Sequence, residues 1–334
     1  MSERSALIDE FLIRTGWVDV KRSLLAADAS FRQYERIKIS NKTAILMDAP
    51  PPKENIRPFI KITEHLAKLG YSVPQIFAKD IDAGFLLLED FGDETFTKAL
   101  TAKVDEMQLY QSAIDVLINL HSRELSEVIP DGVKNYDHNT LLAEVVLFVD
   151  WYIPGLFGDT YTEYVKNDFL CIWDKLLSEV SSENETLVLR DFHADNLMWL
   201  PSRDGIRKCG LLDYQDAVKG SPAYDIASLF EDARRDLKPG MASDLLDYYF
   251  TALPKVDRRR FNKIYAILSA QRHCKVIGIF ARLAIRDGKR NYLKHINRCW
   301  RLLERVSSSP ELKVLDDWLN ANIPVNKRTG QIVT

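Results

Sequence analysis

Residues 187–200 read Leu-Val-Leu-Arg-Asp-Phe-His-Ala-Asp-Asn-Leu-Met-Trp-Leu, and residues 210–216 read Gly-Leu-Leu-Asp-Tyr-Gln-Asp. Asp191 and Asn196 stand five positions apart in a polar segment between two apolar runs. Asp213 follows the next apolar run. Two carboxylates and one amide therefore stand close to the ends of short apolar segments. This spacing decides how the rest of the chain is interpreted.

A β-hairpin is predicted from the apolar runs at 197–200 and 206–212, because residues 201–205 between them are typical of a turn. Such a hairpin brings Asn196 and Asp213 to the same end. The plain alternative is a solvated surface hairpin, since Asp and Asn favour turns for conformational reasons alone. The apolar strands argue against that alternative, because polar groups at the mouth of a buried hairpin need partners.

The three residues match the needs of phosphoryl transfer, which uses a carboxylate to orient and accept the hydroxyl proton and metal ions on the phosphate oxygens. Asp191 suits the first role, and Asn196 and Asp213 supply the hard oxygen ligands that Mg²⁺ prefers. A competing interpretation takes Asp191, His193 and Asp195 as metal ligands for hydrolysis, because alternate residues of an extended segment share a face. We favour phosphoryl transfer, since the sequence contains no second cluster of His and Asp ligands.

Composition narrows the class of protein. The chain has 334 residues, a formal net charge of -3, 46% hydrophobic residues and no basic or acidic tail, which is typical of a globular protein without a nucleic-acid or membrane partner. The four cysteines are far apart and include no CxxC pair, which argues against a zinc site and for a reducing compartment. No leader peptide or uninterrupted apolar stretch of bilayer-spanning length is apparent. We expect a cytoplasmic protein that acts on a small molecule.

The fold class predicted from the pattern is α+β, with two lobes and a tail. Residues 1–91 read as a small lobe with a mixed β-sheet, which we assign to nucleotide binding. Residues 92–322 read as a larger, mainly helical lobe for catalysis and substrate binding. Residues 323–334 are polar and contain Pro324 and Gly330, so we expect this tail to be held loosely.

The segments Arg190-Asp-Phe-His-Ala-Asp-Asn196 and Leu212-Asp-Tyr-Gln-Asp-Ala217 resemble motifs of the aminoglycoside phosphotransferase and choline kinase superfamily. The resemblance covers nearly the whole chain. It implies a protein-kinase-like bilobal fold and an ATP- and Mg²⁺-dependent kinase. By similarity Asp191 is the catalytic base, and Asn196 and Asp213 are the metal ligands.

Two further residues acquire supporting roles from the same resemblance. His193 becomes a residue that braces the catalytic loop rather than a metal ligand. Asp225, in Ser221-Pro-Ala-Tyr-Asp-Ile-Ala-Ser228, matches the buried acid that braces the same loop. An ordinary carboxylate at a helix N-terminus is an equally good interpretation of Asp225, and the two are compatible.

Nucleotide binding departs from the usual pattern. No glycine occurs between Gly16 and Gly70, so the chain has neither a Walker loop nor the kinase Gly-rich loop. Residues 43–47 also lack the lysine that usually grips the phosphates. We expect the turn at residues 26–32 to replace the Gly-rich loop and the lysine. Ser30, the backbone amides near it and the positive charge of Arg32 are the predicted phosphate contacts. The alternative is that Arg32 is a solvated strand residue.

The segment 87–92, Leu-Leu-Glu-Asp-Phe-Gly, resembles the hinge that joins the lobes of kinases. Its backbone would hydrogen-bond adenine, and Glu89 and Phe91 are the residues predicted to make these contacts. A plain turn is the alternative. ATP is therefore the expected cosubstrate.

A narrower resemblance points to the acceptor. Segments 25–32, 144–152 and 271–283 are similar to the bacterial anomeric kinases of N-acetylmuramate and N-acetylglucosamine, which recycle cell-wall sugars. Glu144 and Trp151 recur at helical spacing and could form a sugar platform.

Arg272 could contact an acidic acceptor, since adjacent polar residues of a helix point in different directions. Core packing of Trp151 and solvation of Glu144 and Arg272 are the plain alternatives.

Two other functions stay open at this point. One is a kinase of aminoglycosides or small amino alcohols, although no dense acidic cluster for a polycation is visible. The other is a pseudokinase that binds nucleotide, suggested by the missing lysine and glycines. The complete set of Asp191, Asn196 and Asp213 favours an active enzyme.

Overall fold

A computed structural model describes residues 3–27, 31–158, 163–180 and 185–332. The chain forms two compact units. Unit 1 consists of Met1–Val116 and Ala194–Ala217, and unit 2 consists of Leu117–His193 and Val218–Thr334. The division into a nucleotide-binding lobe before residue 92 and a catalytic lobe after it stays a proposal, because the two compact units are defined by contacts and not by function.

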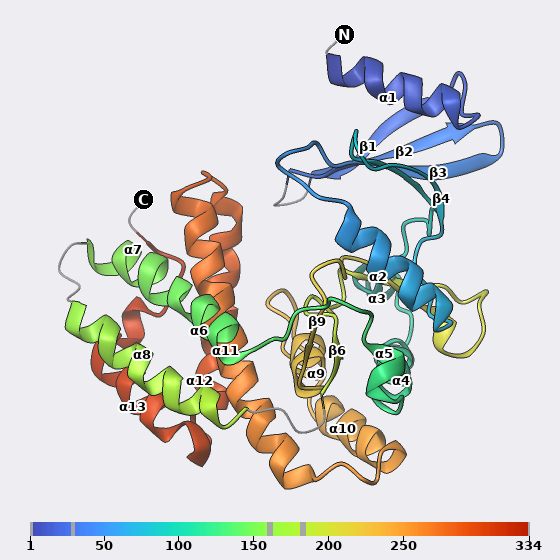
Figure 1. Ribbon diagram of the computed structural model, residues 1–334. Helices are drawn as coiled ribbons and strands as arrows, with labels where there is room; N and C mark the ends of the chain where they lie inside the picture. Colours follow the sequence, from blue (N-terminus) through green and yellow to red (C-terminus); the bar gives the residue numbers. More distant parts are fainter. Residues whose placement is uncertain (1–2, 28–30, 159–162, 181–184, 333–334) are drawn as a thin grey trace. The chain divides into compact units, whose positions relative to one another are not determined.

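Unit 1 is built on a five-stranded sheet with the strand order β1-β2-β3-β5-β4. Every pairing is antiparallel. The prediction of a mixed sheet was therefore wrong in this detail. Helix α1 (Glu3–Arg14) lies beside the sheet in Figure 1. Its Phe11 and Leu12 belong to one buried apolar cluster with Ile37 and Leu46 of the sheet. The strands are β1 (Lys21–Ala27), β2 (Gln33–Ile39), β3 (Lys42–Asp48), β4 (Ile76–Asp80) and β5 (Phe85–Leu88).

The predicted hairpin also belongs to unit 1. Strand β7 (Leu197–Trp199) pairs antiparallel with β8 (Cys209–Leu211), and the 3₁₀ turn Gly205–Lys208 lies in the connection. All six strand residues are buried. Besides α1, the helices of this unit are α2 (Arg57–Lys68), α3 (Phe96–Thr101) and the start of α4 (Glu106–His121).

Unit 2 is mainly helical, as predicted. Its one sheet in the described chain is the antiparallel pair β6 (Thr186–Val188) and β9 (Val218–Gly220). The longest helix is α11 (Arg258–Ile285), which contacts α6, η1, α9 and α12. The other elements are α5 (Leu125–Val128), α6 (His138–Leu147), the π-helix η1 (Phe148–Tyr152), α7 (Ile153–Phe157), α8 (Glu163–Ser178), α9 (Ala223–Phe230), α10 (Met241–Ala252), η4 (Arg290–His295), α12 (Ile296–Ser307), η5 (Pro310–Leu312), α13 (Lys313–Asn322) and η6 (Val325–Lys327).

The continuous helical segment His138–Phe157 is long and apolar enough to cross a membrane, the one such segment in the described part of the chain. No segment of this kind was predicted from the sequence. Its apolar residues Leu141, Val145 and Phe148 are buried. The segment packs on α11 and α8, which is how the core helix of a globular unit behaves.

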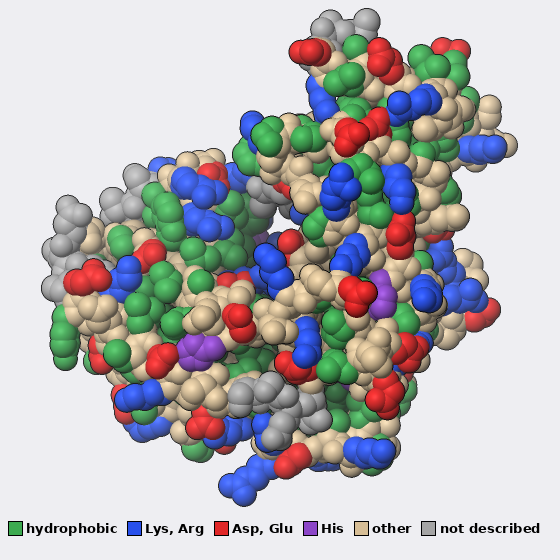
Figure 2. Space-filling view, viewed as in Figure 1, with side chains coloured by type: hydrophobic (Ala, Val, Ile, Leu, Met, Phe, Trp, Pro, Cys, Tyr) green, Lys and Arg blue, Asp and Glu red, His purple; other side chains and the backbone are tan. Residues whose placement is uncertain are grey.

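The mixed surface agrees with the low net charge. On the face shown in Figure 2, acidic and basic side chains alternate with apolar and polar ones, and no large area carries a single sign.

Helix α11 crosses the junction of α6 and η1 at Gly278. A Cβ atom on Gly278 would lie 2.3 Å from the carbonyl carbon and 2.5 Å from the oxygen of Leu147, both backbone atoms. Backbone cannot yield as a flexible side chain can, so this crossing requires glycine. We predict that Gly278→Ala lowers the free energy of unfolding by about 1–3 kcal/mol, which is the typical cost of overpacking a tight contact.

Chemical denaturation of the variant beside Gly205→Ala would check this prediction. Gly205 has open space around its Cβ position but a positive φ, so that control reports backbone strain without the clash. An equal loss of stability in both variants would contradict the role of the crossing.

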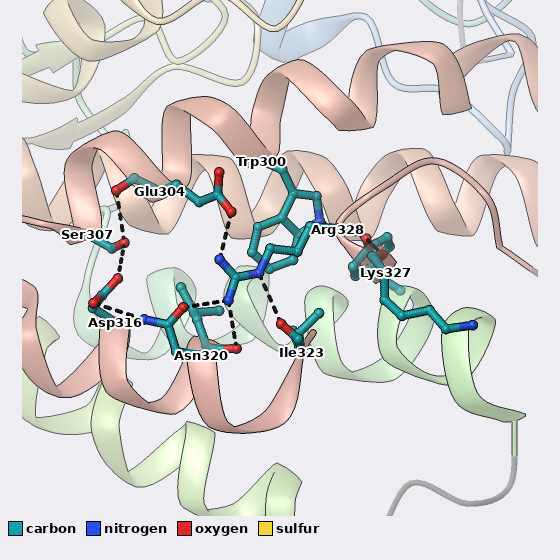
Figure 3. Close-up of polar contacts among 10 residues, drawn as sticks. Trp300, Glu304, Ser307, Asp316, Asn320, Ile323, Lys327 and Arg328 are labelled. Atoms are coloured by element: carbon teal, nitrogen blue, oxygen red, sulfur yellow. Dashed lines mark hydrogen bonds and ion pairs between the residues drawn. The ribbon is translucent and has the colours of Figure 1, made fainter. Parts of the chain in front are cut away.

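The C-terminal segment is anchored rather than held loosely, at least as far as residue 332. Arg328 donates hydrogen bonds to the backbone carbonyl of Ile323 at 3.0 Å and to the carboxylate of Glu304 at 2.6 Å (Figure 3). Tyr152 Oη donates to the carbonyls of Lys327 and Thr329, each at 3.0 Å. The polar composition suggested a loosely held tail, but backbone carbonyls of this segment accept hydrogen bonds from Tyr152 and hold it in place.

Candidate functional site

The residues predicted to act in function fall into two groups, one in each unit. Asn196, Asp213 and the nucleotide-contact candidates belong to unit 1. Asp191 and the acceptor-contact candidates belong to unit 2.

In unit 1 the hairpin brings Asn196 and Asp213 together. Asn196 Nδ2 donates to Asp213 Oδ2 at 3.3 Å, and the Leu212 N–H donates to the Asn196 carbonyl at 3.0 Å. Gln215 Nε2 donates to Asp213 Oδ1 at 2.9 Å. The predicted convergence of these two residues at one end of the hairpin is therefore present.

The backbone at Asp213 has a φ of 58°, in the left-handed region that non-glycine residues rarely adopt. The next residue fixes this turn. Tyr214 is buried, its ring stacks on Phe59 of α2 with centroids 5.6 Å apart, and its hydroxyl lies 2.9 Å from that of Thr63. A strained conformation persists where surrounding contacts determine it, and such positions cluster at functional sites.

Arg32 lies beside Asp213. Its guanidinium is 4.0 Å from Asp213 Oδ1 and 3.7 Å from Glu54 Oε2, and its side chain is only 11% exposed. It is therefore not the solvated strand residue of the plain alternative. Burial lowers the pKa of Arg32, but Tyr34, Asp213 and Glu54 outweigh it and raise the pKa.

The structure says less about the other residues predicted to contact the nucleotide. Ser30 lies outside the described residues. The Glu89 N–H already donates to the Gln75 carbonyl at 2.8 Å, and the Glu89 carboxylate accepts from Arg203. The Arg203 guanidinium also lies 4.8 Å above the ring of Phe91. The adenine contacts of Glu89 and Phe91 stay a prediction.

Asn196 and Asp213 suit Mg²⁺ in number and chemistry. Among the described residues no three His, Cys, Asp or Glu side chains group as a metal site. Mg²⁺ in phosphotransferases is held by one or two protein oxygens plus substrate phosphates, so a closed protein cage is not needed. With Nδ2 of Asn196 directed at Asp213, Oδ1 is the amide atom that would bind metal.

In unit 2 the loop that carries Asp191 is held by Asp225. The Leu189 and Arg190 N–H groups donate to the two Asp225 carboxylate oxygens at 2.7 and 2.8 Å. Asp225 is fully buried in the first turn of α9, and burial raises the pKa of Asp225 to about 7 despite these two hydrogen bonds. Arg190 has a φ of 69°, a second left-handed residue that these bonds hold in place. Asp225 thus makes the contact that the bracing role requires.

Positive charges surround Asp191. Burial alone would raise the pKa of Asp191, but the charges of Lys275, His193 and Arg272 outweigh burial and lower it. The carboxylate is therefore ionised at neutral pH, which is the form that a base or an orienting group needs.

Glu144 is the centre of a buried polar network. Its carboxylate pairs with Arg190 and with Lys275 Nζ, the latter at 2.9 Å. It also accepts from Gln271 Nε2 at 3.1 Å and from the Tyr136 hydroxyl. Glu144 is not a solvated helix acid, since its side chain is 13% exposed. The four partners make Glu144 a link between α6, α11 and the residue that precedes Asp191.

The other acceptor-side candidates differ in environment. Arg272 is buried, and its Nη1 has no hydrogen-bond acceptor among the described residues. Trp151 is half-buried in η1. His193 is buried, and burial, the largest effect, lowers its pKa. The backbone N–H of His193 donates to the Asp191 carbonyl at 3.1 Å. The bracing role of the His193 side chain stays a prediction.

Three residues of these networks were not assigned a role from the sequence: Lys275, Tyr136 and Arg190. The available signal was the polar run Gln271, Arg272, His273 and Lys275 within an apolar helix. All four are buried, so they are not a solvated stripe. Tyr136 carried no sequence signal, because its contact with Glu144 depends on how α6 begins.

Lys275 is predicted to set the ionisation of Asp191. Replacing Lys275 by Met removes the largest charge that lowers the pKa of Asp191, so that pKa rises and the acidic limb of the kcat/KM profile moves to higher pH. The free energy of unfolding should also fall by about 1–3 kcal/mol, since Glu144 loses a charged partner.

The pH dependence of turnover, measured beside an exposed control, checks this. Lys263→Met is suitable, because Lys263 lies on the same helix and pairs with Glu179 at the surface. An acidic limb unmoved in Lys275→Met, with stability reduced, would restrict Lys275 to a structural role.

Known proteins resemble this chain along most of its length. The model of the phosphotransferase enzyme family (APH) matches residues 21–262. An N-acetylmuramate/N-acetylglucosamine kinase of Caulobacter vibrioides is 34% identical, with 98% of this chain and 99% of that protein aligned. A kinase of the same name from Pseudomonas aeruginosa is 35% identical over 95% of this chain and 94% of its own length. The structure of choline kinase LicA from Streptococcus pneumoniae shares the fold, with a TM-score of 0.63 at 17% identity, covering 92% of this chain and all of that one.

Proposed function

Since the chain belongs to the phosphotransferase enzyme family, we propose that it is an ATP- and Mg²⁺-dependent kinase of the anomeric hydroxyl of N-acetylmuramate and N-acetylglucosamine. The observation that carries the reaction class is the ionised Asp191 in a loop braced by Asp225, together with the Asn196–Asp213 pair. The names of full-length relatives at about one-third identity support the acceptor. The reaction fits the recycling of cell-wall sugars, with the enzyme in the cytoplasm.

Asp191 orients the acceptor hydroxyl and accepts its proton as the phosphoryl group is transferred in line. The left-handed Arg190 and the two backbone bonds to Asp225 hold the Asp191 side chain in place, which reduces the entropy that must be lost on reaching the transition state. Lys275 and Arg190 keep the carboxylate ionised until the hydroxyl proton arrives.

Nucleotide binding in this proposal uses Arg32 in place of the missing strand lysine. Arg32 lies beside Asp213, so one cation and one metal ligand face the same space in unit 1. Mg²⁺, when bound through Asn196 and Asp213, would neutralise charge on the phosphate oxygens. Ser30 supplies a hydroxyl near the phosphates, and the backbone at Glu89 and Phe91 binds adenine.

Acceptor binding is assigned to Trp151 and Arg272. Glu144 contributes mainly by holding its four side-chain partners in place. The unsatisfied Arg272 Nη1 is suited to the lactyl carboxylate or to the ring oxygens of an amino sugar. A direct contact of Glu144 with the sugar stays part of the proposal, but its carboxylate already has four partners.

The two alternatives are weaker. A polycationic aminoglycoside would meet the buried positive charges of Arg272 and Lys275, and a small amino alcohol would meet the same charges. A pseudokinase is suggested by the missing lysine, but Arg32 places a cation next to Asp213.

The experiment is ADP release with N-acetylmuramate, N-acetylglucosamine, kanamycin and choline as acceptors, followed by ³¹P NMR of the product. Turnover of the two amino sugars, with a phosphorus coupled to the anomeric proton, is expected. Preferred turnover of kanamycin or choline would overturn the acceptor assignment. ATP binding with no turnover of any acceptor would support the pseudokinase.

A further inference from the structure

A basic cavity in unit 2 is not used by the proposed reaction. Its volume is about 670 Å³, within the range of about 300–1,000 Å³ that small-molecule sites occupy. It is formed by the start of α12, the preceding turn η4 and the anchored C-terminal segment. The lining residues are Arg234, Lys294, His295, Asn297, Arg298, Trp300, Arg301, Glu304, Val325 and Arg328.

One wall of the cavity is rigid. Figure 3 shows Arg328 directed between α12 and α13, where it donates to Glu304 at 2.6 Å, to Asn320 Oδ1 at 2.6 Å and to the Ile323 carbonyl at 3.0 Å. The guanidinium carbon lies 5.3 Å from the ring centroid of Trp300. A wall made this way exists before any ligand arrives, so binding orders little of it.

The charge of the lining is strongly unbalanced. Five of the lining residues are Lys or Arg, and Glu304 is the one carboxylate among them. Arg328 pairs with Glu304, which leaves Arg234, Lys294, Arg298 and Arg301 as the other basic residues of the lining. Arg298 and Arg301 share a single carboxylate, that of Asp236, at 3.3 and 3.1 Å. Lys294 forms no ion pair with any residue that the structure describes.

Two further observations indicate an excess of positive charge at this cavity. Burial and then the charges of Arg234, Lys294 and Arg298 lower the pKa of His295, so the local potential is positive. Arg298 Nε is buried and has no acceptor within the described chain. Buried donors normally have a partner, and an anion would supply one.

We propose that this cavity binds the negatively charged group of a sugar-sized ligand, a carboxylate or a phosphate. Arginine recognises both groups through the same paired N–H donors, while Lys294 adds a point charge. The cavity is also linked electrostatically to the catalytic loop, because the charge of Arg234 acts on His193. The identity of the ligand rests on the proposed function: N-acetylmuramate carries a carboxylate, and the phosphorylated product carries a phosphate.

The test compares cavity variants with a charge-matched control. Lys294→Gln and Arg298→Gln each remove one cavity charge, and Lys294 is exposed, so its variant is expected to fold. Arg259→Gln removes one charge from another cavity of unit 2, of about 780 Å³, whose lining mixes basic residues with Glu179, Asp257 and Glu311.

Isothermal titration without ATP would give the affinities for N-acetylmuramate, N-acetylglucosamine, N-acetylglucosamine 1-phosphate and inorganic phosphate. We expect both cavity variants to weaken anion binding about tenfold, since hydrogen bonds to charged groups are of that strength. Arg259→Gln and the affinity for N-acetylglucosamine should be unchanged. An effect confined to N-acetylmuramate identifies the acceptor as the ligand, and one confined to the phosphates identifies the product.

Unchanged anion affinities in both cavity variants, or an equal loss in Arg259→Gln, would overturn the proposal, as would a wild-type protein that binds none of the anions. Phosphoryl transfer is measured separately by ADP release. Failure of transfer with anion binding still sensitive to Lys294 would reject the proposed reaction and keep the cavity site.

Discussion

Replacing Asp191 by Asn is expected to lower kcat about 10²- to 10⁴-fold, which is the range that a positioned acid–base group contributes. The amide retains the size of the side chain but cannot accept the hydroxyl proton. The KM for ATP should change little, because the nucleotide-contact candidates lie in unit 1. Steady-state ADP release, with ATP affinity measured by titration, checks both expectations.

The control for this variant is Asp131→Asn, an exposed acid in a turn of unit 2. It should leave kcat unchanged. If Asp191→Asn retained wild-type turnover with the amino sugars, Asp191 would not be the base, and the assignment of the loop would be wrong.

Replacing Asp225 by Ala is expected to lower the free energy of unfolding by about 2–5 kcal/mol, because two backbone N–H groups lose their acceptors at once. Asn keeps one acceptor oxygen, so Asp225→Asn should cost less. Both variants should also reduce kcat by about 10-fold or more, since the Asp191 side chain loses its fixed position. Chemical denaturation and ADP release on the same samples measure the two effects, with Asp131→Asn as the surface control.

The pH dependence of this stability has a defined sign. The pKa of Asp225 is raised from 3.8 to about 7 in the folded protein, so the folded state retains a proton that the unfolded state has lost between these values. The stability of the wild type relative to Asp225→Asn should therefore be greatest below about pH 4 and fall as the pH rises through 7. A relative stability that rises over this interval would show that the buried carboxylate is ionised.

Much of the fold was predictable, because its signals are local. The hairpin at β7 and β8 follows from two apolar runs and a turn, and the convergence of Asn196 and Asp213 follows from the hairpin. Strand β4 and helix α3 were not predicted. Short elements such as Ile76–Asp80 carry too few residues for a periodic pattern, and their stability comes from tertiary contacts.

The candidate site was predictable where its residues are close in sequence or are joined by one hairpin. Asp191 and Asn196 are close along the chain, whereas the partners of Glu144 come from the connection between α5 and α6, from α11 and from the catalytic loop. The pairing of Glu144 with Lys275 depends on how α6 and α11 cross, and that crossing depends on the missing side chain of Gly278. A single glycine in a long helix gives no sign of what it packs against.

The Glu144 network also constrains how this chain can diverge. Glu144 contacts Arg190, Lys275, Gln271 and Tyr136 at once, so no one of these five can change its charge or length without stranding another in the interior. Related sequences that alter one of them should therefore alter a second in the same lineage. A change of acceptor preference that involves a substitution of Glu144 in α6 would also require substitutions in α11 and beside Asp191. New specificities should therefore arise by correlated substitutions rather than by single ones.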